Sequence, residues 1–243
     1  MLSIFELIFE EFEQELEDIR VLIEPVTDAR PRATARVAGA NAAVLLLAAT
    51  FEEFIRNSAR EYARAVVAAT PSYDRLPPKI AAVVWKRTME GLARIHLNPK
   101  TEVFSRESIF ADAQTRFSIA YQFCRGDLTQ DIYQDLIHNE NNMRPQEVNS
   151  LFKVSSLTNV CFLIANSDGL KEFFGNEDQV TVHSKLLNLL DNFFDRRNQT
   201  AHSVAAMSSV SPDAIRTDID FLCTFAKALA TTLTGEAPPP VAR

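Results

Sequence analysis

Four side chains that can act on a phosphate group lie within seven residues near the end of the sequence. They are Arg196, Arg197, Asn198 and His202. Arginine offers a planar fork of N–H donors that matches phosphate oxygens, and histidine can accept or release a proton near neutral pH. Together these groups can present a cation, an amide and an imidazole to a single phosphate-sized target.

The spacing of the four residues fits a helix. Asn198 and His202 are four residues apart and share a helical face, whereas Arg197 and His202 are five apart and about 140° around the axis. An arginine is long enough to reach back toward the histidine. An apolar stripe before the cluster predicts the buried face of the same helix, and it consists of Leu186, Leu187, Leu190, Phe193 and Phe194.

A purely structural interpretation of the cluster also fits the sequence. In this alternative, Arg196 and Arg197 pair with Asp191 and Asp195 along the helix. His202 then caps the carboxyl end of the helix, where the helix dipole favours a cation.

The sequence of the cluster resembles a known family motif. Arg197-Asn198-Gln199-Thr200-Ala201-His202 resembles the Arg-(polar)-x-x-x-His motif of the HEPN superfamily. The segment from Leu45 to Arg56 is similar to the alanine-rich "aa-phe-glu" helix of some toxin-like HEPN families. The resemblance covers residues 35 to 230. It implies an all-α, HEPN-like helical bundle.

The same resemblance implies a function. It predicts a metal-independent endoribonuclease of the toxin–antitoxin or phage-defence type, which leaves 2′,3′-cyclic phosphate ends. Arg197, Asn198 and His202 are its expected catalytic residues, and Arg196 is expected to bind the RNA substrate. The alternative is a non-catalytic HEPN-like module that binds a nucleotide or a protein partner, and an unrelated helical scaffold is a third possibility.

The resemblance also predicts partners. A single histidine supplies a base but leaves the departing 5′-oxygen without an acid. HEPN nucleases form composite sites at a two-fold dimer interface, so we expect a homodimer in which two copies of Arg197 and His202 face each other across one cleft. A cognate antitoxin protein fits the class.

The composition of the chain limits how it could bind nucleic acid and which other chemistry it could carry out. The chain has 243 residues, 47% of them hydrophobic, with 6 glycines and a net charge of −7. This charge argues against coating nucleic acid through a general basic field, so RNA contacts require a local basic patch. The cysteines are scattered and suggest buried thiols in a reducing compartment; they are Cys124, Cys161 and Cys223. No metal site or cofactor is expected.

Elements that position the cluster follow from periodicity and from prolines. Residues 1–30 are predicted to be an amphipathic helical extension with its connector, and residues 31–234 a HEPN-like domain in which 127–180 is a possible insertion. Residues 235–243 are predicted to be a disordered tail. The apolar run from Ala38 to Ala49 is too short to span a bilayer, so we expect a cytoplasmic protein without a membrane partner.

Overall fold

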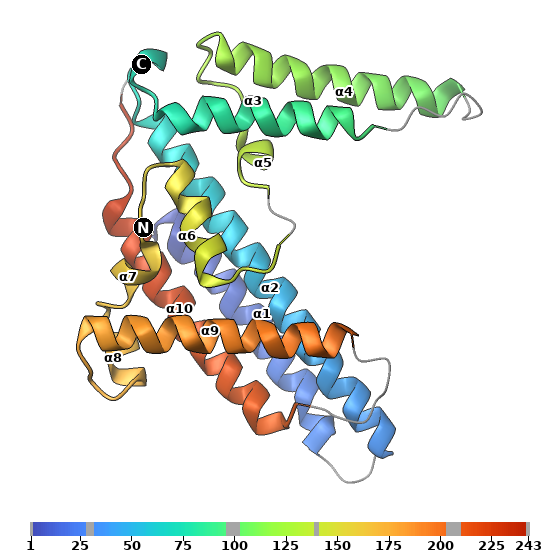
Figure 1. Cartoon of the computed structure of the whole chain (residues 1–243), viewed down its shortest axis with the longest axis vertical. Coiled ribbons are helices and arrows are strands. Elements are labelled where there is room, and N and C mark those ends of the chain that lie inside the picture. Colours follow the sequence, from blue (N-terminus) through green and yellow to red (C-terminus); the bar gives the residue numbers. More distant parts are fainter. Residues whose placement is uncertain (1, 28–31, 96–102, 139–140, 203–209, 242–243) are drawn as a thin grey trace. The chain divides into compact units, whose positions relative to one another are not determined.

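The computed structural model describes residues 2–27, 32–95, 103–138, 141–202 and 210–241, except for the side chains of residues 25–27, 103–104 and 202. All regular secondary structure in these ranges is helical, which confirms the predicted all-α fold (Figure 1). The elements in chain order are α1 (Ile4–Thr27), α2 (Ala33–Ala68), η1 (Tyr73–Arg75), α3 (Pro78–Ala93), α4 (Val103–Cys124), α5 (Tyr133–Leu136), α6 (Pro145–Val154), α7 (Val160–Ile164), α8 (Asp168–Phe173), α9 (Gln179–His202) and α10 (Pro212–Glu236).

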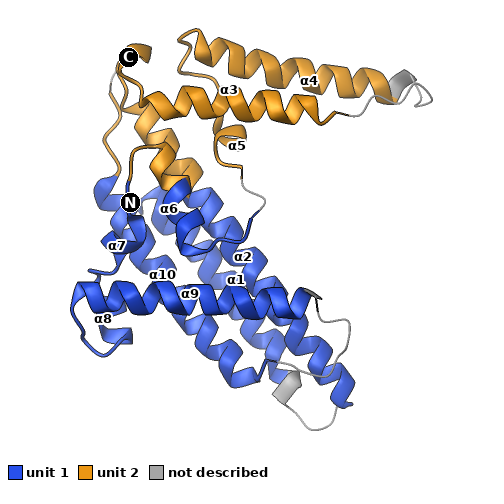
Figure 2. Ribbon diagram, viewed as in Figure 1, with its two compact units in different colours: residues 1–58, 141–150, 158–236 blue, residues 59–140, 151–157, 237–243 orange. Residues whose placement is uncertain are grey.

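The chain divides into two compact units (Figure 2). Unit 1 contains residues 1–58, 141–150 and 158–236, and unit 2 contains residues 59–140, 151–157 and 237–243. This division differs from the domain boundaries predicted above. The expected amino-terminal extension is part of unit 1, and the expected insertion is divided between both units.

Aromatic packing explains why α1 belongs to unit 1. The ring of Phe51 on α2 lies 6.3 Å from Phe12 on α1, 6.3 Å from Phe194 on α9 and 5.4 Å from Phe225 on α10. All four side chains are buried. Burial of each such ring contributes about 1.5–3 kcal/mol, so the apolar face of α1 forms part of the core and is not an appended element.

The helix α2 is long and apolar, and part of it is buried in the core of unit 1. By length and composition alone this helix could cross a membrane. The core helix of a soluble protein meets the same criterion, and Val44, Leu47 and Ile55 are buried within unit 1. Of the apolar 18-residue window in α2, 33% is buried inside the structure.

Local signals determine where the two carboxyl-terminal helices begin. The carboxylate of Asp178 accepts hydrogen bonds from the backbone N–H groups of Val180 (2.9 Å) and Thr181 (3.2 Å) at the start of α9. Ser211 caps α10 by accepting from the N–H of Ala214 at 3.2 Å. The helix α9 then continues as far as His202, so the motif lies on regular helix.

Unit 2 contains the end of α2, the α3–α4 pair and α5, together with residues 151–157 and 237–243. The ring of Tyr62 packs edge-on against Phe152 at 6.1 Å. The N–H of Val241 donates to the carbonyl oxygen of Ala68 at 3.2 Å. Part of the segment predicted to be a disordered tail therefore has a defined backbone contact.

Candidate active site

The rotation of α9 about its axis is fixed by the predicted apolar stripe. Leu186, Leu190 and Phe193 are buried in unit 1. Arg197 and Asn198 lie at the edge of this buried face, and both side chains are half-buried. The stripe therefore holds the cation and the amide partly out of water, where their hydrogen bonds are stronger than on an open surface.

Arg196 forms an ion pair that the sequence did not predict. Its Nη2 contacts the carboxylate of Asp218 on α10, whose side chain is only 3% exposed. Burial raises the pKa of Asp218 to about 6, although the charge of Arg196 acts to lower it. The ion pair between Arg196 and Asp218 thus joins α9 to α10, and the carboxylate of Asp218 largely neutralises the charge of Arg196.

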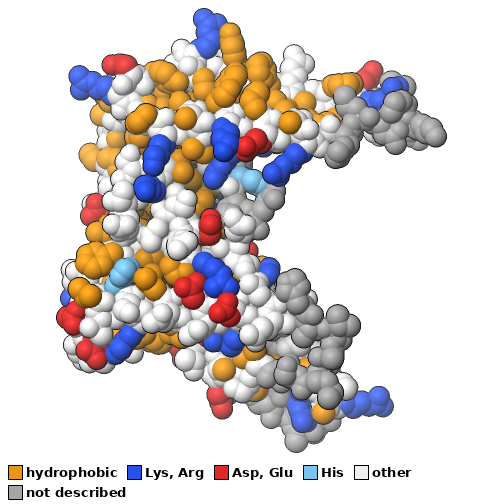
Figure 3. Space-filling view, in the orientation of Figure 1, with side chains coloured by type: hydrophobic (Ala, Val, Ile, Leu, Met, Phe, Trp, Pro, Cys, Tyr) orange, Lys and Arg blue, Asp and Glu red, His pale blue; other side chains and the backbone are white. Residues whose placement is uncertain are grey.

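The acidic residues of α9 pair with an arginine from another segment. Arg144 contacts Asp191 through Nη1 at 3.1 Å and Asp195 through Nη2 at 2.5 Å. Basic and acidic side chains adjoin over the middle of α9 in Figure 3. The structural interpretation from the sequence is wrong about these pairs. Asp191 and Asp195 face the same side because they are one turn apart, and the arginines one and two positions beyond Asp195 face elsewhere.

Arg197 makes no ion pair within 4.0 Å among the described residues. Its Nη1 donates to Oδ1 of Asn198 at 3.3 Å, and its Nε is buried without an acceptor. The carboxylate of Glu52 on α2 is electrostatically coupled to Arg197, whose charge lowers the pKa of Glu52. Arg197 is therefore a half-buried cation whose charge is not matched by a direct ion pair among the described residues.

Glu52 completes this side of the site. Its side chain is 14% exposed, and burial raises the pKa of the carboxyl group. Arg56 (3.9 Å), Arg197 and a hydrogen bond from the backbone N–H of Met143 act in the opposite direction. The carboxyl group of Glu52 can therefore attract the guanidinium of Arg197 electrostatically without forming a direct ion pair with it.

The segment 141–144 packs onto this part of α9. Nδ2 of Asn142 donates to Oδ1 of Asn198 at 2.8 Å, and the side chain of Met143 is fully buried. Asn198 Oδ1 therefore accepts from both Asn142 and Arg197. Its amide nitrogen has no hydrogen-bond partner among the residues that the structure describes, which leaves a donor for a ligand.

His202 is the last residue of α9, and its side chain lies outside the described part of the structure. Its backbone lies one helical turn beyond Asn198. The structure thus brings Arg197 and Asn198 together with Glu52 and Asn142, while the predicted role of the imidazole stays a prediction.

Comparison with known proteins identifies the family. The model of the RiboL-PSP-HEPN family matches residues 10–235. The chain belongs to the RiboL-PSP-HEPN family. The HEPN resemblance predicted from the two helical motifs is therefore confirmed, and the match begins within α1 at residue 10 and ends within α10 at residue 235. No curated protein and no solved structure matches the chain.

Three residues of this HEPN site were missed at the sequence level, and only one had a usable signal. Glu52 lies in the segment that resembles the "aa-phe-glu" helix. Asn142 lies in an asparagine-rich stretch that turn formation explains equally well. Asp218 had no signal, because its partner Arg196 is on another helix.

The described residues of the HEPN chain contain no group of three or more His, Cys, Asp or Glu side chains that could hold a metal ion. Burial raises the pKa of the Cys161 thiol to about 12 and also raises the pKa of Cys223. Because the thiolate is the reactive form, these cysteines are poor nucleophiles.

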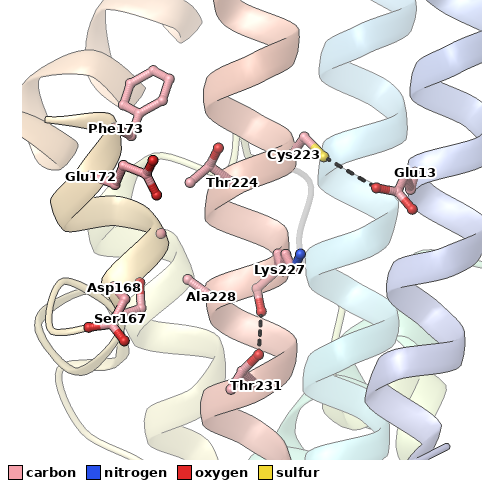
Figure 4. Close-up of a pocket in the computed structure, with 11 residues that line it drawn as sticks. Glu13, Ser167, Asp168, Glu172, Phe173, Cys223, Thr224, Lys227, Ala228 and Thr231 are labelled. Atoms are coloured by element: carbon pink, nitrogen blue, oxygen red, sulfur yellow. Dashed lines mark hydrogen bonds between the residues drawn. The ribbon is translucent and has the colours of Figure 1, made fainter.

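A separate hollow of about 720 Å³ lies among α1, α8 and α10 (Figure 4). Three carboxylates line it, from Glu13, Asp168 and Glu172, against the single cation of Lys227. Cys223 Sγ lies 3.9 Å from Glu13 in this hollow. The excess of negative charge makes this hollow unsuitable for the phosphates of RNA.

Proposed function

We propose that this HEPN chain is a metal-independent endoribonuclease of the toxin–antitoxin or phage-defence type. The observation that carries the proposal is the contrast between two adjacent arginines. Asp218 neutralises Arg196, whereas Arg197 is half-buried and makes no ion pair within 4.0 Å among the described residues. A cation held in this state suits the charge that develops on a phosphate during strand cleavage.

The proposed chemistry uses the motif directly. His202 accepts the proton of a 2′-hydroxyl, and the 2′-oxygen attacks the adjacent phosphorus. Arg197 stabilises the negative charge on the non-bridging oxygens, and the amide nitrogen of Asn198, which has no partner among the described residues, donates to one of them. The bond from phosphorus to the 5′-oxygen breaks, and that oxygen takes a proton, which gives a 2′,3′-cyclic phosphate and a 5′-hydroxyl. Arg196, which the sequence assigned to RNA binding, acts through its ion pair and positions α9.

One histidine cannot act as base and acid in the same step. We propose that two chains associate with two-fold symmetry, so that the second copy of His202 protonates the departing 5′-oxygen. RNA is then the substrate of a composite site, and a cognate antitoxin protein is the expected partner that blocks it.

The experiment that tests the function is cleavage of an end-labelled, structured RNA in the presence of EDTA. The wild-type chain is compared with His202→Ala and Arg197→Ala, and the product ends are identified. We expect cyclic-phosphate ends from the wild type and losses of at least about 100-fold in both variants.

Two matched variants control for general damage. His183→Ala removes the other histidine of α9, and Arg216→Ala removes an exposed arginine of α10 that pairs with Asp213 at 2.7 Å. Both should cut as the wild type does. Failure of a folded wild-type protein to cut RNA, or equal cutting by His202→Ala, would contradict the proposal and favour a non-catalytic binding module.

A further inference from the structure

The part of α2 that belongs to unit 1 carries two apolar stripes on opposite sides (Figure 2). The inner stripe consists of buried side chains, and its members are Ala40, Val44, Leu47 and Phe51. The outer stripe consists of exposed side chains, and its members are Ala35, Ala38, Ala42, Leu45 and Ala49. The two stripes are two residues out of step, which is about 200° around a helix. The outer stripe therefore faces away from the core.

The outer stripe leaves apolar surface in contact with water. Leu45 is 37% exposed, and its neighbour Leu46 is 46% exposed. The sequence contains no charged residue from position 37 to position 51, although only 33% of the apolar window of α2 is buried. Contiguous apolar surface that stays exposed on a folded chain is typical of an interaction site.

The spacing of the outer stripe is that of a two-stranded coiled coil. Its members follow one another at intervals of three, four, three and four residues, which are the a and d positions of a heptad repeat. A seam of this kind packs against a helix that has the same spacing. Four of the five positions are alanine, so two helices can approach to about 8 Å, the short end of the usual range. A second copy of α2 offers the matching seam.

Charge also favours a second copy as the occupant. RNA requires cations, which the stripe lacks. Each chain has a net charge of −7, so two copies repel one another over much of their surfaces and meet without opposed charges on an uncharged stripe. A lipid bilayer would contact only one side of α2, because on the inner side Phe51 packs against the rings of Phe12, Phe194 and Phe225.

The outer stripe continues into the candidate active site. Three residues after Ala49 the same spacing reaches Glu52, whose side chain is 14% exposed and whose carboxyl group is electrostatically coupled to Arg197. At this level α9 crosses α2, where the rings of Phe194 and Phe51 are 6.3 Å apart (Figure 1). A chain bound on the outer stripe would therefore lie beside the end of α9 that carries the motif.

The two possible directions of the paired helices place the active sites differently. In an antiparallel pair centred on Ala42, the two copies of Glu52 would lie about 30 Å apart along the helices, because each is ten residues from the centre. In a parallel pair each residue lies opposite its own copy, so the two sites face each other at one level. Only the parallel pair brings a second His202 close enough to protonate the departing oxygen.

The size of the outer stripe indicates that the contact extends beyond it. The stripe is about 21 Å long, and a helix pair of that length supplies only part of the roughly 800 Å² that each partner buries in a stable dimer. We propose that a second copy of this chain binds the outer stripe through its own outer stripe, in parallel register. This inference rests on the proposed function, which requires a second His202, and it adds the surface and the register.

The first test is analytical ultracentrifugation of the full chain without RNA. Leu45→Glu places a carboxylate opposite its own copy, so the dissociation constant of the dimer should rise at least about 10-fold. The matched control is Leu22→Glu on α1, where the leucine is 46% exposed, and it should associate as the wild type does. Circular dichroism should show that both variants remain folded, because both leucines are exposed.

Cross-linking tests the register. Ala38→Cys and Ala49→Cys, each examined alone, should form a disulfide with their own copies on mild oxidation, because a parallel pair brings both sets of Cβ atoms within reach. Val180→Cys on α9, at a side chain that is 67% exposed, is the control. It should link no faster than the wild type, which contains three native cysteines.

Three results would overturn the proposed surface or its register. They are a monomeric wild-type chain, a Leu45→Glu dimer as stable as the wild type, and linkage of Ala38→Cys to Ala49→Cys in preference to linkage of either with itself. A monomer that binds phosphatidylcholine vesicles, and no longer does so as Leu45→Glu, would assign the outer stripe to a bilayer instead.

RNA cutting separates this inference from the proposed function. A dimer that depends on Leu45 but cuts no RNA would disprove the nuclease and leave the surface assignment standing. Full cutting by a monomeric Leu45→Glu protein would leave the nuclease standing and overturn the role of this surface in a composite site. We expect the monomeric variant to lose cutting at least about 10-fold, although Arg197, Asn198 and His202 are unchanged in it.

Discussion

Asn142 donates from its Nδ2 to Oδ1 of Asn198 at 2.8 Å and so orients the amide of the motif residue. Arg197 donates to the same oxygen at 3.3 Å. With both donors on one side, the amide nitrogen of Asn198 points to the other side, where a phosphate oxygen can accept from it. Asn142 is therefore a positioning residue for the proposed reaction.

A double-mutant cycle tests this relationship. Asn142→Ala and Asn198→Ala should each lower kcat about 10-fold with little change in KM, because the lost donor acts in the transition state. The double variant should lose no more than Asn198→Ala alone, since Asn142 acts through Asn198. Losses that multiply would show that Asn142 contributes independently. Asn142→Gln, which keeps the donor, is the variant expected to recover part of the activity.

Substitution of Arg196 should mainly lower stability, whereas substitution of Arg197 should mainly lower activity. Arg196→Ala leaves the buried Asp218 without its cation, and we expect a loss of about 3 kcal/mol in the free energy of unfolding at pH 7. Arg197→Ala should cost less than about 1 kcal/mol, because that arginine makes no ion pair within 4.0 Å among the described residues. Urea denaturation and cleavage assays on both variants check the contrast. A larger stability loss in Arg197→Ala would contradict it.

The raised pKa of Asp218 predicts that the free energy of unfolding depends on pH in a specific way. Its folded-state pKa of about 6 lies above the ordinary value of 3.8, so the folded state binds more protons than the unfolded state between these values. The contribution of Asp218 is therefore present below pH 4 and is lost as pH rises through 6, by about 3 kcal/mol.

Thermal or urea denaturation between pH 4 and 7 measures this effect. Asp218→Asn should remove the corresponding slope, while Asp213→Asn, at a side chain that is 90% exposed on the same helix, should keep it. An identical pH dependence in wild type and Asp218→Asn would contradict the assignment. The cost of Arg196→Ala should also shrink at pH 5, where Asp218 is protonated in both proteins.

Glu52 is expected to matter for activity more than for stability. Burial raises its pKa, so the neutral Glu52→Gln side chain should fold at least as well as the wild type. Activity should fall about 10-fold because Arg197 loses the nearby negative charge that holds it. Glu53→Gln, at a side chain that is 50% exposed on the adjacent position of α2, is the control. A clear loss of stability in Glu52→Gln would indicate that the charged form is needed for folding.

Periodicity predicted the amino-terminal helix and the helix that carries the motif, because it depends on neighbours along the chain. The apolar stripe that ends at Phe194 is buried as predicted. The apolar run from Val160 to Ile164, which forms α7, is too short for its sequence to distinguish the period of a helix from that of a strand.

The contacts of the site were less predictable than its residues. The motif placed Arg197, Asn198 and His202 on one helix, but spacing along that helix says nothing of partners on other segments. Asn142 is 56 residues from Asn198, and Asp218 is 22 residues from Arg196. These pairs depend on how the helices pack, which the sequence pattern alone does not determine.

The ion pairs of Arg144 with Asp191 and Asp195 should be sensitive to the salt concentration. Its contacts with Asp191 and Asp195 involve side chains that are 33%, 47% and 58% exposed, so dissolved ions weaken them. These contacts hold the segment that carries Asn142 against the motif. Ionic strength would therefore adjust the turnover of the proposed reaction from within the protein, and its rate at saturating RNA would decline as salt rises, apart from any effect on substrate affinity.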